Sequence, residues 1–197
     1  RVYTGTIDEK PEEVVARITQ HLAERFPNQS VAQTLADLPA DERRAWFDSL
    51  SLNEQSALEY EWQFWARPNQ REPKDLYKIW IILAGRGFGK SKAAAETVRK
   101  WIESGEKKHI ALIAANAADM RDTMIEEVYK QGSGMMQICP PWNKPHYSPT
   151  KKTLVWTNPN YPSYGAVCSL YSGEEPDCYD EKTEVLTDNG WKLFMNL

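Results

Sequence analysis

The chain has 197 residues, of which 41% are hydrophobic and 26% charged, and its formal net charge is −4. Such a composition is typical of a soluble protein with one cored domain and a small appendage, and no apolar run approaches the ~20 residues that a membrane-spanning helix needs. The three cysteines, Cys139, Cys168 and Cys178, are few and lack metal-ligand spacing, which favours a reducing compartment over a disulfide scaffold.

The N-terminal part of the chain is predicted to be helical. Segment 11–25 carries apolar residues at helical spacing and begins with a proline, which suits a first turn. A second helix is expected over 40–50, and a third from the capping-box spacing of Ser51 and Glu54 to about residue 64. We therefore expect residues 1–57 to form a helical N-terminal region without chemistry of its own.

Residues 84–91 read Ala-Gly-Arg-Gly-Phe-Gly-Lys-Ser, between an apolar β-type run at 79–83 and a helical run at 92–104. Strand, glycine-rich turn, Lys-Ser and helix is the order that cradles a nucleoside triphosphate, since glycines turn backbone N–H groups toward phosphates at a helix N-terminus. Ala84 stands where the full phosphate-loop pattern has its first glycine. Lysine at position 90, where a dinucleotide-binding motif needs glycine, excludes that motif.

The expected phosphate-binding residues are Gly85, Arg86, Gly87, Phe88, Gly89, Lys90 and Ser91. Lys90 can reach the β- and γ-phosphates, and the Ser91 hydroxyl can bind Mg²⁺. The alternative is a glycine-rich loop without function. Upstream, the proline-bounded loop 66–73 contains Gln70, whose amide can both donate to and accept from an adenine edge, or else belongs to a solvated linker.

The remaining pattern alternates strands and helices. A strand is expected over 108–115, a helix after Asn116, and two further strands over 153–157 and 164–171. We therefore predict an α/β fold with a mostly parallel sheet of the P-loop nucleoside triphosphatase type and right-handed crossovers. The last two strands, if antiparallel, would form an insertion or an edge of that sheet.

Four ordered stretches resemble the large terminase subunit of tailed bacteriophages, the ATP-driven DNA-packaging motor. They are the run from Trp62 to Gln70, "IWIILAGRGFGKSKAAAETV", "ALIAANAADMRDTM" and "YSGEEPD". The resemblance covers 58–177 as a partial P-loop ATPase domain. It implies ATP and Mg²⁺ as cofactors, an adenine contact for Gln70, and a place near the γ-phosphate for Arg86, which otherwise is a solvent-facing loop residue.

The same resemblance implies the partners. They would be double-stranded DNA, the small terminase subunit, the portal and other copies of this chain in a ring. The protein would act in the host cytoplasm, at the portal of the procapsid, without a membrane partner.

One departure from the family follows "SGEEPD". The family continues with a short basic loop and a strand that ends in an Asp-Glu pair, which holds Mg²⁺ and orients water. This chain continues instead from Cys178 with a different sequence, and neither that Walker B pair nor the nuclease half is found in it. We therefore expect the isolated chain to bind ATP weakly and to hydrolyse it poorly.

Residues 178–197 resemble the N-terminal segment of an intein. The Cys178 thiol could attack the preceding carbonyl and convert the Asp177–Cys178 amide into a thioester. Segments 183–187 and 191–194 flank Asp-Asn-Gly, a hairpin turn signal. The chain would then be half of a split intein, joined in trans to a complementary intein and C-terminal terminase fragment, or a truncated sequence; alternatively, Cys178 is an ordinary cysteine.

Two other functions stay open at this point. The chain could be a P-loop ATPase of helicase or transport type with a non-splicing tail. It could also be a binding module with a degenerate phosphate loop and no enzymatic activity.

Overall fold

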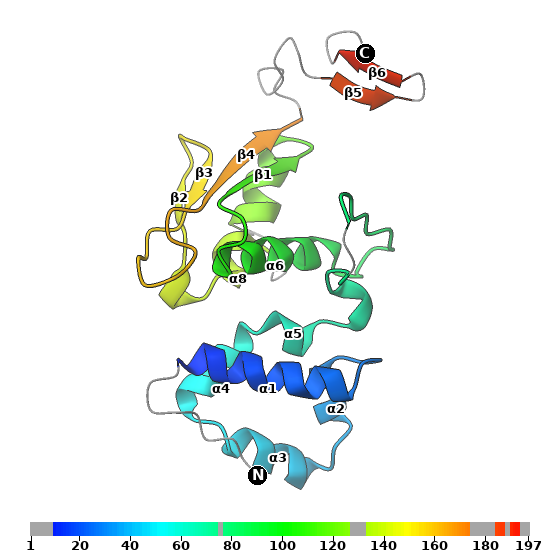
Figure 1. Ribbon diagram of the computed structural model, residues 1–197, viewed down its shortest axis with the longest axis vertical. Helices are drawn as coiled ribbons and strands as arrows, with labels where there is room; N and C mark the ends of the chain where they lie inside the picture. The colour runs from blue at the N-terminus through cyan, green and yellow to red at the C-terminus, as the bar shows by residue number, and fades with distance from the viewer. Residues whose placement is uncertain (1–9, 75–76, 127–132, 174–183, 188–189, 194–197) are drawn as a thin grey trace. The chain divides into compact units, whose positions relative to one another are not determined.

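The computed structural model describes residues 10–74, 77–126, 133–173, 184–187 and 190–193. The chain divides into two compact units, one formed by Arg1–Lys100 with Ile138–Trp142 and the other by Trp101–Gln137 with Asn143–Leu197. Each unit has its own secondary structure, drawn in Figure 1.

The first unit is mostly helical, and helices lie at or near the three segments 11–25, 40–50 and 51–64 where the sequence predicts them. It contains α1 (Pro11–Arg25), α2 (Val31–Ala36), α3 (Ala40–Asp48), α4 (Leu52–Glu59), α5 (Trp62–Trp65), the 3₁₀ turn η1 (Pro68–Gln70) and most of α6 (Lys90–Glu103). The helix expected from residue 51 to about 64 is two helices, α4 and α5, and the sequence pattern missed α2. The capping box is confirmed, because Ser51 Oγ accepts from the Glu54 amide and the Glu54 carboxylate accepts from the Ser51 amide.

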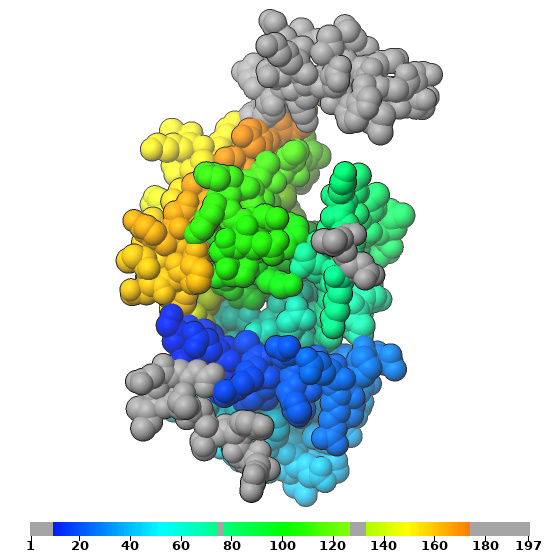
Figure 2. Space-filling view, in the orientation of Figure 1, coloured from blue at the N-terminus to red at the C-terminus, as the bar shows by residue number. Residues whose placement is uncertain are grey.

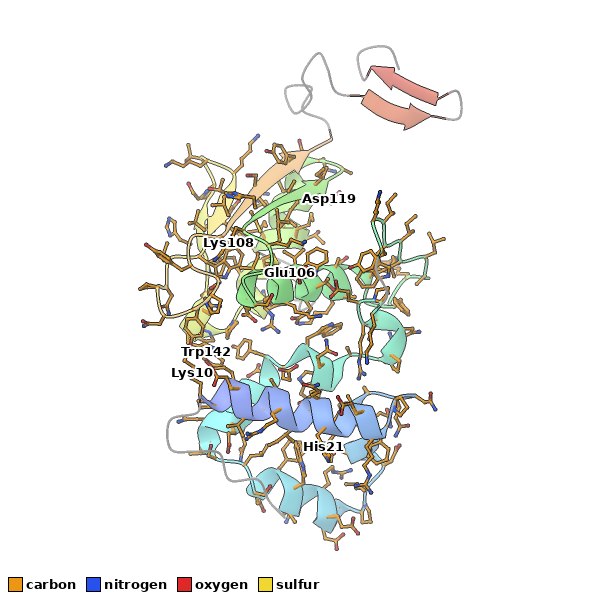
Figure 3. The ribbon with its side chains drawn as sticks, in the orientation of Figure 1. Lys10, His21, Glu106, Lys108, Asp119 and Trp142 are labelled. Carbon is orange, nitrogen blue, oxygen red and sulfur yellow. The ribbon has the colours of Figure 1, made fainter. Side chains whose placement is uncertain are left out.

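Two apolar clusters hold this unit together. The larger joins α1, α2, α4 and α5, and its buried members are Val15, Val31, Leu35, Leu50, Ala57, Leu58 and Phe64. Trp142, labelled in Figure 3, packs on this cluster and lies edge-on to Tyr60 at 5.4 Å between ring centroids. The smaller cluster consists of Trp62, Ala66 and Ala93, with Ile82 against it, so the start of α6 is packed on α5.

A buried arginine also fixes α6 in the first unit. Arg99 forms an ion pair with Glu96 at 2.9 Å, and its guanidinium donates to the carbonyls of Tyr60 and Ile138. The charge of Glu96 and the two carbonyl acceptors compensate the burial of the guanidinium. The helix that follows the glycine-rich loop is therefore rigidly seated.

The second unit contains a four-stranded sheet in the order β1-β4-β3-β2. The strands are β1 (His109–Ala114), β2 (His146–Ser148), β3 (Thr153–Val155) and β4 (Val167–Ser172). β1 and β4 are parallel, with His109 opposite Val167, and Figure 1 shows them side by side. The second unit also contains α7 (Ala117–Asp119), the π-helical turn η2 (Met120–Ile125) and most of α8 (Met135–Ile138), whereas the 3₁₀ turn η3 (Pro141–Asn143) lies mostly in the first unit.

The sheet of the second unit has its core on alternate residues of β4. Cys168, Leu170 and Ser172 are buried, whereas the residues between them are less so. At the start of β1, Lys108, labelled in Figure 3, donates to the carbonyls of Pro162 and Tyr164 and so ties the strand to the loop before β4.

The mixed α/β class is confirmed, but the mostly parallel sheet is not. Among the described strands, β1 with β4 is a parallel pairing, whereas β4 with β3 and β3 with β2 are antiparallel. The strand expected over 79–83 is wrong for this structure, because that segment forms neither a strand nor a helix. The two strands expected over 153–157 and 164–171 are present as the antiparallel pair β3 and β4, and β2, which forms the edge beside β3, is a strand that the sequence pattern missed.

Near the C-terminus, β5 (Glu184–Thr187) and β6 (Gly190–Leu193) form an antiparallel pair in which Glu184 lies opposite Leu193. This agrees with the predicted hairpin, whose turn lies outside the described residues. No helix among the residues that the structure describes combines the length and the apolar character needed to cross a membrane.

Candidate nucleotide site

The glycine-rich loop closes directly onto the first turn of α6. Gly87 and Gly89 have φ of 82° and 91°, in the left-handed region that only glycine adopts readily. The Phe88 amide donates to the Gly85 carbonyl, and the Ala93 amide donates to the Gly89 carbonyl at 2.9 Å. The loop thus has the compact turn and the helix N-terminus that suit an anion.

Lys90 is folded back on its own loop. Its Nζ donates to the carbonyls of Ala84 and Gly85 at 2.8 and 3.0 Å. Ser91 and Arg86 are exposed, and the residues around Gly85 and Gly87 leave space, because a Cβ at either position would meet nothing within 4 Å. The loop therefore presents an open surface and a lysine whose partners are exchangeable carbonyls.

Gln70 lies against this loop, although 18 residues separate it from Phe88. It is 8% exposed, and its Nε2 donates to the Phe88 carbonyl at 2.7 Å. Its Oε1 accepts from the amide and from the Nε of Arg67, at 3.1 and 3.2 Å. The structure brings Gln70 and the glycine-rich loop together, and its contact with a base remains a prediction.

Arg67 is a site residue that the sequence reasoning missed. Its Nη2 donates to the Phe88 carbonyl at 2.7 Å, and its guanidinium carbon lies 5.1 Å from the centroid of the Phe88 ring. A basic residue three positions before a glutamine carries no signal of its own. The only indication in the sequence is Pro68 between them, which starts the 3₁₀ turn Pro68–Gln70, with Arg67 directly before that turn and Gln70 at its end.

The segment before the loop shows several of its apolar residues to solvent. Ile79, Ile81 and Leu83 are 78%, 68% and 91% exposed, whereas Ile82 packs against the smaller cluster of the first unit. Figure 2 shows this stretch, between blue-green and green, at the surface. The segment has the two apolar faces of a buried strand, with only one of them covered.

Buried charges near α5 and η1 have shifted pKa values. Burial raises the pKa of the Glu61 carboxyl, although its bond from the Gln63 amide and the Arg99 charge act in the opposite direction. Burial lowers the pKa of Arg71, whose Nη2 donates to the carbonyls of Gln63 and Ala66. These groups fix the chain entering η1 and are structural.

The predicted splicing nucleophile Cys178 lies outside the described residues. Among those that are described, no group of three or more His, Cys, Asp or Glu side chains could hold a metal ion.

Comparison with known proteins gives one family. Residues 81–182, slightly more than half of the chain, match the family model described as "Terminase large subunit, T4likevirus-type, N-terminal". Neither the curated proteins nor the solved structures contain a significant match. The match begins within the exposed segment before the loop and includes the loop, α6 and the four-stranded sheet.

Proposed function

The chain belongs to the family of T4-like terminase large subunits, and from this membership we propose that it supplies the ATP-binding part of a phage DNA-packaging motor. The observation that carries the proposal is the glycine-rich loop, closed by two left-handed glycines directly before the N-terminus of α6. Membership of this family favours packaging over the helicase and transport alternatives.

The loop residues Gly85 to Ser91 would hold the phosphates of ATP. The loop amides and the N-terminus of α6 offer donors to an anion, and Lys90 exchanges its bonds to the Ala84 and Gly85 carbonyls for phosphate oxygens. The Ser91 hydroxyl would bind Mg²⁺, which supplies neutralisation of phosphate charge when bound. Exposed Arg86 is free to turn toward the γ-phosphate side, where a guanidinium offsets developing charge.

Gln70 would have fewer hydrogen-bonding groups available for adenine than an unbonded amide side chain has. Both lone pairs of Oε1 are used by Arg67, and one Nε2 hydrogen is used by the Phe88 carbonyl. The group left for a base is the second Nε2 hydrogen, which can donate to a ring nitrogen. We therefore expect Gln70 to contribute to base binding as a donor.

The motor would work with double-stranded DNA, the small terminase subunit, the portal and further copies of this chain, in the host cytoplasm at the procapsid. These partners follow from the family and are part of the proposal.

We also propose that residues 178–197 are the N-terminal segment of an intein. The Cys178 sulfur attacks the Asp177 carbonyl carbon, the C–N bond breaks, and the freed amine takes the thiol proton, so the step is an isomerisation. One observation supports a separate tail: the antiparallel pair β5 and β6 lies beyond residue 182, where the family match ends.

ATP binding is tested with Lys90→Ala in the full chain. Lys90 is the lysine of the phosphate-loop motif, at the start of α6, and its positive charge would bind phosphate oxygens. We therefore expect its loss to weaken Mg²⁺-ATP binding at least about tenfold, measured by calorimetry. Lys92→Ala is the matched control, since Lys92 pairs with Glu96 on α6 outside the loop. Equal affinity in the unsubstituted chain and Lys90→Ala would contradict the proposal.

The splicing proposal is tested by adding a complementary intein fragment with dithiothreitol and measuring intact mass. We expect cleavage after Asp177, because the thiol reagent intercepts a thioester. Cys178→Ala should abolish cleavage, and Cys168→Ala should retain it. Cleavage that persists in Cys178→Ala, or none in the unsubstituted chain, would exclude the thioester step.

A further inference from the structure

The Phe88 carbonyl is held from outside the loop by two side chains. Arg67 Nη2 and Gln70 Nε2 each donate to it at 2.7 Å. A carbonyl oxygen has two lone pairs, so these donors saturate it. We call this arrangement the Arg67 clasp, formed by Arg67, Gln70 and the Phe88 carbonyl.

The clasp determines where the next amide points. The peptide bond between Phe88 and Gly89 is planar and trans, so the Gly89 N–H is directed away from the Phe88 carbonyl. Holding that carbonyl toward η1 therefore aims the Gly89 amide to the opposite side. Gly89, with φ of 91°, immediately precedes α6, where a loop amide faces an anion bound at the helix N-terminus.

Arg67 contributes more to the clasp than one hydrogen bond. Its Nε also donates to Gln70 Oε1, which orients the carboxamide so that Nε2 faces Phe88. Its guanidinium lies over the Phe88 ring, 5.1 Å from the centroid. A lysine has no planar fork of donors and cannot make these contacts together.

We propose that Arg67 is a positioning residue of the phosphate loop: by holding the Phe88 carbonyl, it pre-orients the Gly89 amide for a triphosphate. The inference rests on the proposed ATP-binding function. Arg67 acts through the loop and does not itself contact the nucleotide. Without it, the peptide between Phe88 and Gly89 can rotate, and binding must include the cost of ordering it.

The test compares Arg67→Ala, Arg67→Lys and the matched control Lys74→Ala, which removes an exposed positive charge from the same stretch. The probes are Mg²⁺-ATP and inorganic tripolyphosphate, measured by calorimetry on the full chain. We expect the affinity for both probes to fall roughly five- to twentyfold in Arg67→Ala and in Arg67→Lys. The affinity for both probes should stay unchanged in Lys74→Ala.

A second readout needs no ligand. In Arg67→Ala, the ¹⁵N-amide resonance of Gly89 should move and its hydrogen exchange should accelerate, with the thermal midpoint close to that of the unsubstituted chain. A merely structural Arg67 would lower the midpoint and leave the Gly89 resonance in place. Unchanged affinity for both probes in Arg67→Lys would likewise contradict a role for the planar guanidinium donors of Arg67.

The remaining outcomes are distinguishable. A loss for ATP but not for tripolyphosphate would place Arg67 at the base and overturn the positioning role. Undiminished affinity for both probes in Arg67→Ala would contradict the positioning role alone. An unsubstituted chain that binds neither probe would contradict the proposed function, and the positioning role with it.

Discussion

At the residue scale, Gly89 carries two constraints. Its φ of 91° is strained for any residue with a Cβ, and a Cβ built there would approach Gln70 Nε2 to 2.8 Å. Gly85 carries neither constraint, since its surroundings leave a Cβ without contacts within 4 Å. The two glycines of the same loop thus differ in what they can tolerate.

We predict that Gly89→Ala loses both stability and ATP affinity. The left-handed conformation costs roughly 1–2 kcal/mol in a residue with a Cβ, and the new methyl group must also displace the Gln70 amide. Chemical denaturation and calorimetry should show the loss, with Gly85→Ala as the milder control. Equal effects of the two substitutions would contradict the account of the clasp.

The sequence predicts some residues of the candidate site but not the contacts between them. The glycines and Lys90 were identified because their spacing alone implies a phosphate loop. The contact between Gln70 and Phe88 spans 18 residues, and that of Arg67 with Phe88 spans 21. Such contacts depend on how η1 packs, and a local pattern does not contain that information.

At the element scale, the uncovered face of segment 79–83 is the main departure from expectation. Its alternation of exposed and packed apolar residues is that of a strand, yet it has no strand assignment. Local preference favoured a strand there, but a strand exists only when a neighbour supplies the ladder hydrogen bonds. The expectation failed because pairing is a tertiary property.

We predict that this segment promotes self-association. An exposed run of apolar residues gains free energy when another chain covers it. Ile81→Lys should raise the monomer fraction in sedimentation at high concentration. Leu52→Lys is the matched control, because Leu52 is 80% exposed but lies on α4. Association unchanged in Ile81→Lys, or reduced equally by both variants, would exclude this segment.

Helices were predicted best among the elements. The helix at 11–25 was placed at its observed bounds, because a proline and a long apolar period mark it. Short elements such as α2, α5 and β2 were missed or merged, since three to six residues give no period. The parallel sheet was inferred from strand–helix alternation, and the hairpin of β2 and β3 made the described sheet mixed.

At the scale of the whole molecule, the chain has two units with separate cores, and each contains one described thiol. Cys139 belongs to the first unit and Cys168 to the second, and both are buried. Burial raises the pKa of Cys168 to about 12, so it holds little of the reactive thiolate at neutral pH. Labelling of either thiol therefore requires its unit to open.

We predict that Mg²⁺-ATP slows the labelling of Cys139 more than that of Cys168. A ligand stabilises the unit that binds it, and the glycine-rich loop belongs to the first unit. The measurement uses a thiol reagent and mass spectrometry in a Cys178→Ser background, with Lys90→Ala as the control that removes the effect. Equal slowing of both thiols would mean that the units open together.

The sheet order has one more consequence. β1 stands at the end of β1-β4-β3-β2, with β4 as its neighbour among the described strands. Successive amides of an edge strand alternate between facing the neighbour and facing away. Hydrogen exchange therefore divides the amides of β1 into a slow and a fast class at alternate positions. A strand that pairs with this edge would accept hydrogen bonds from the amides of the fast class and slow their exchange. The exchange rates of alternate β1 amides therefore report whether another strand has joined the sheet.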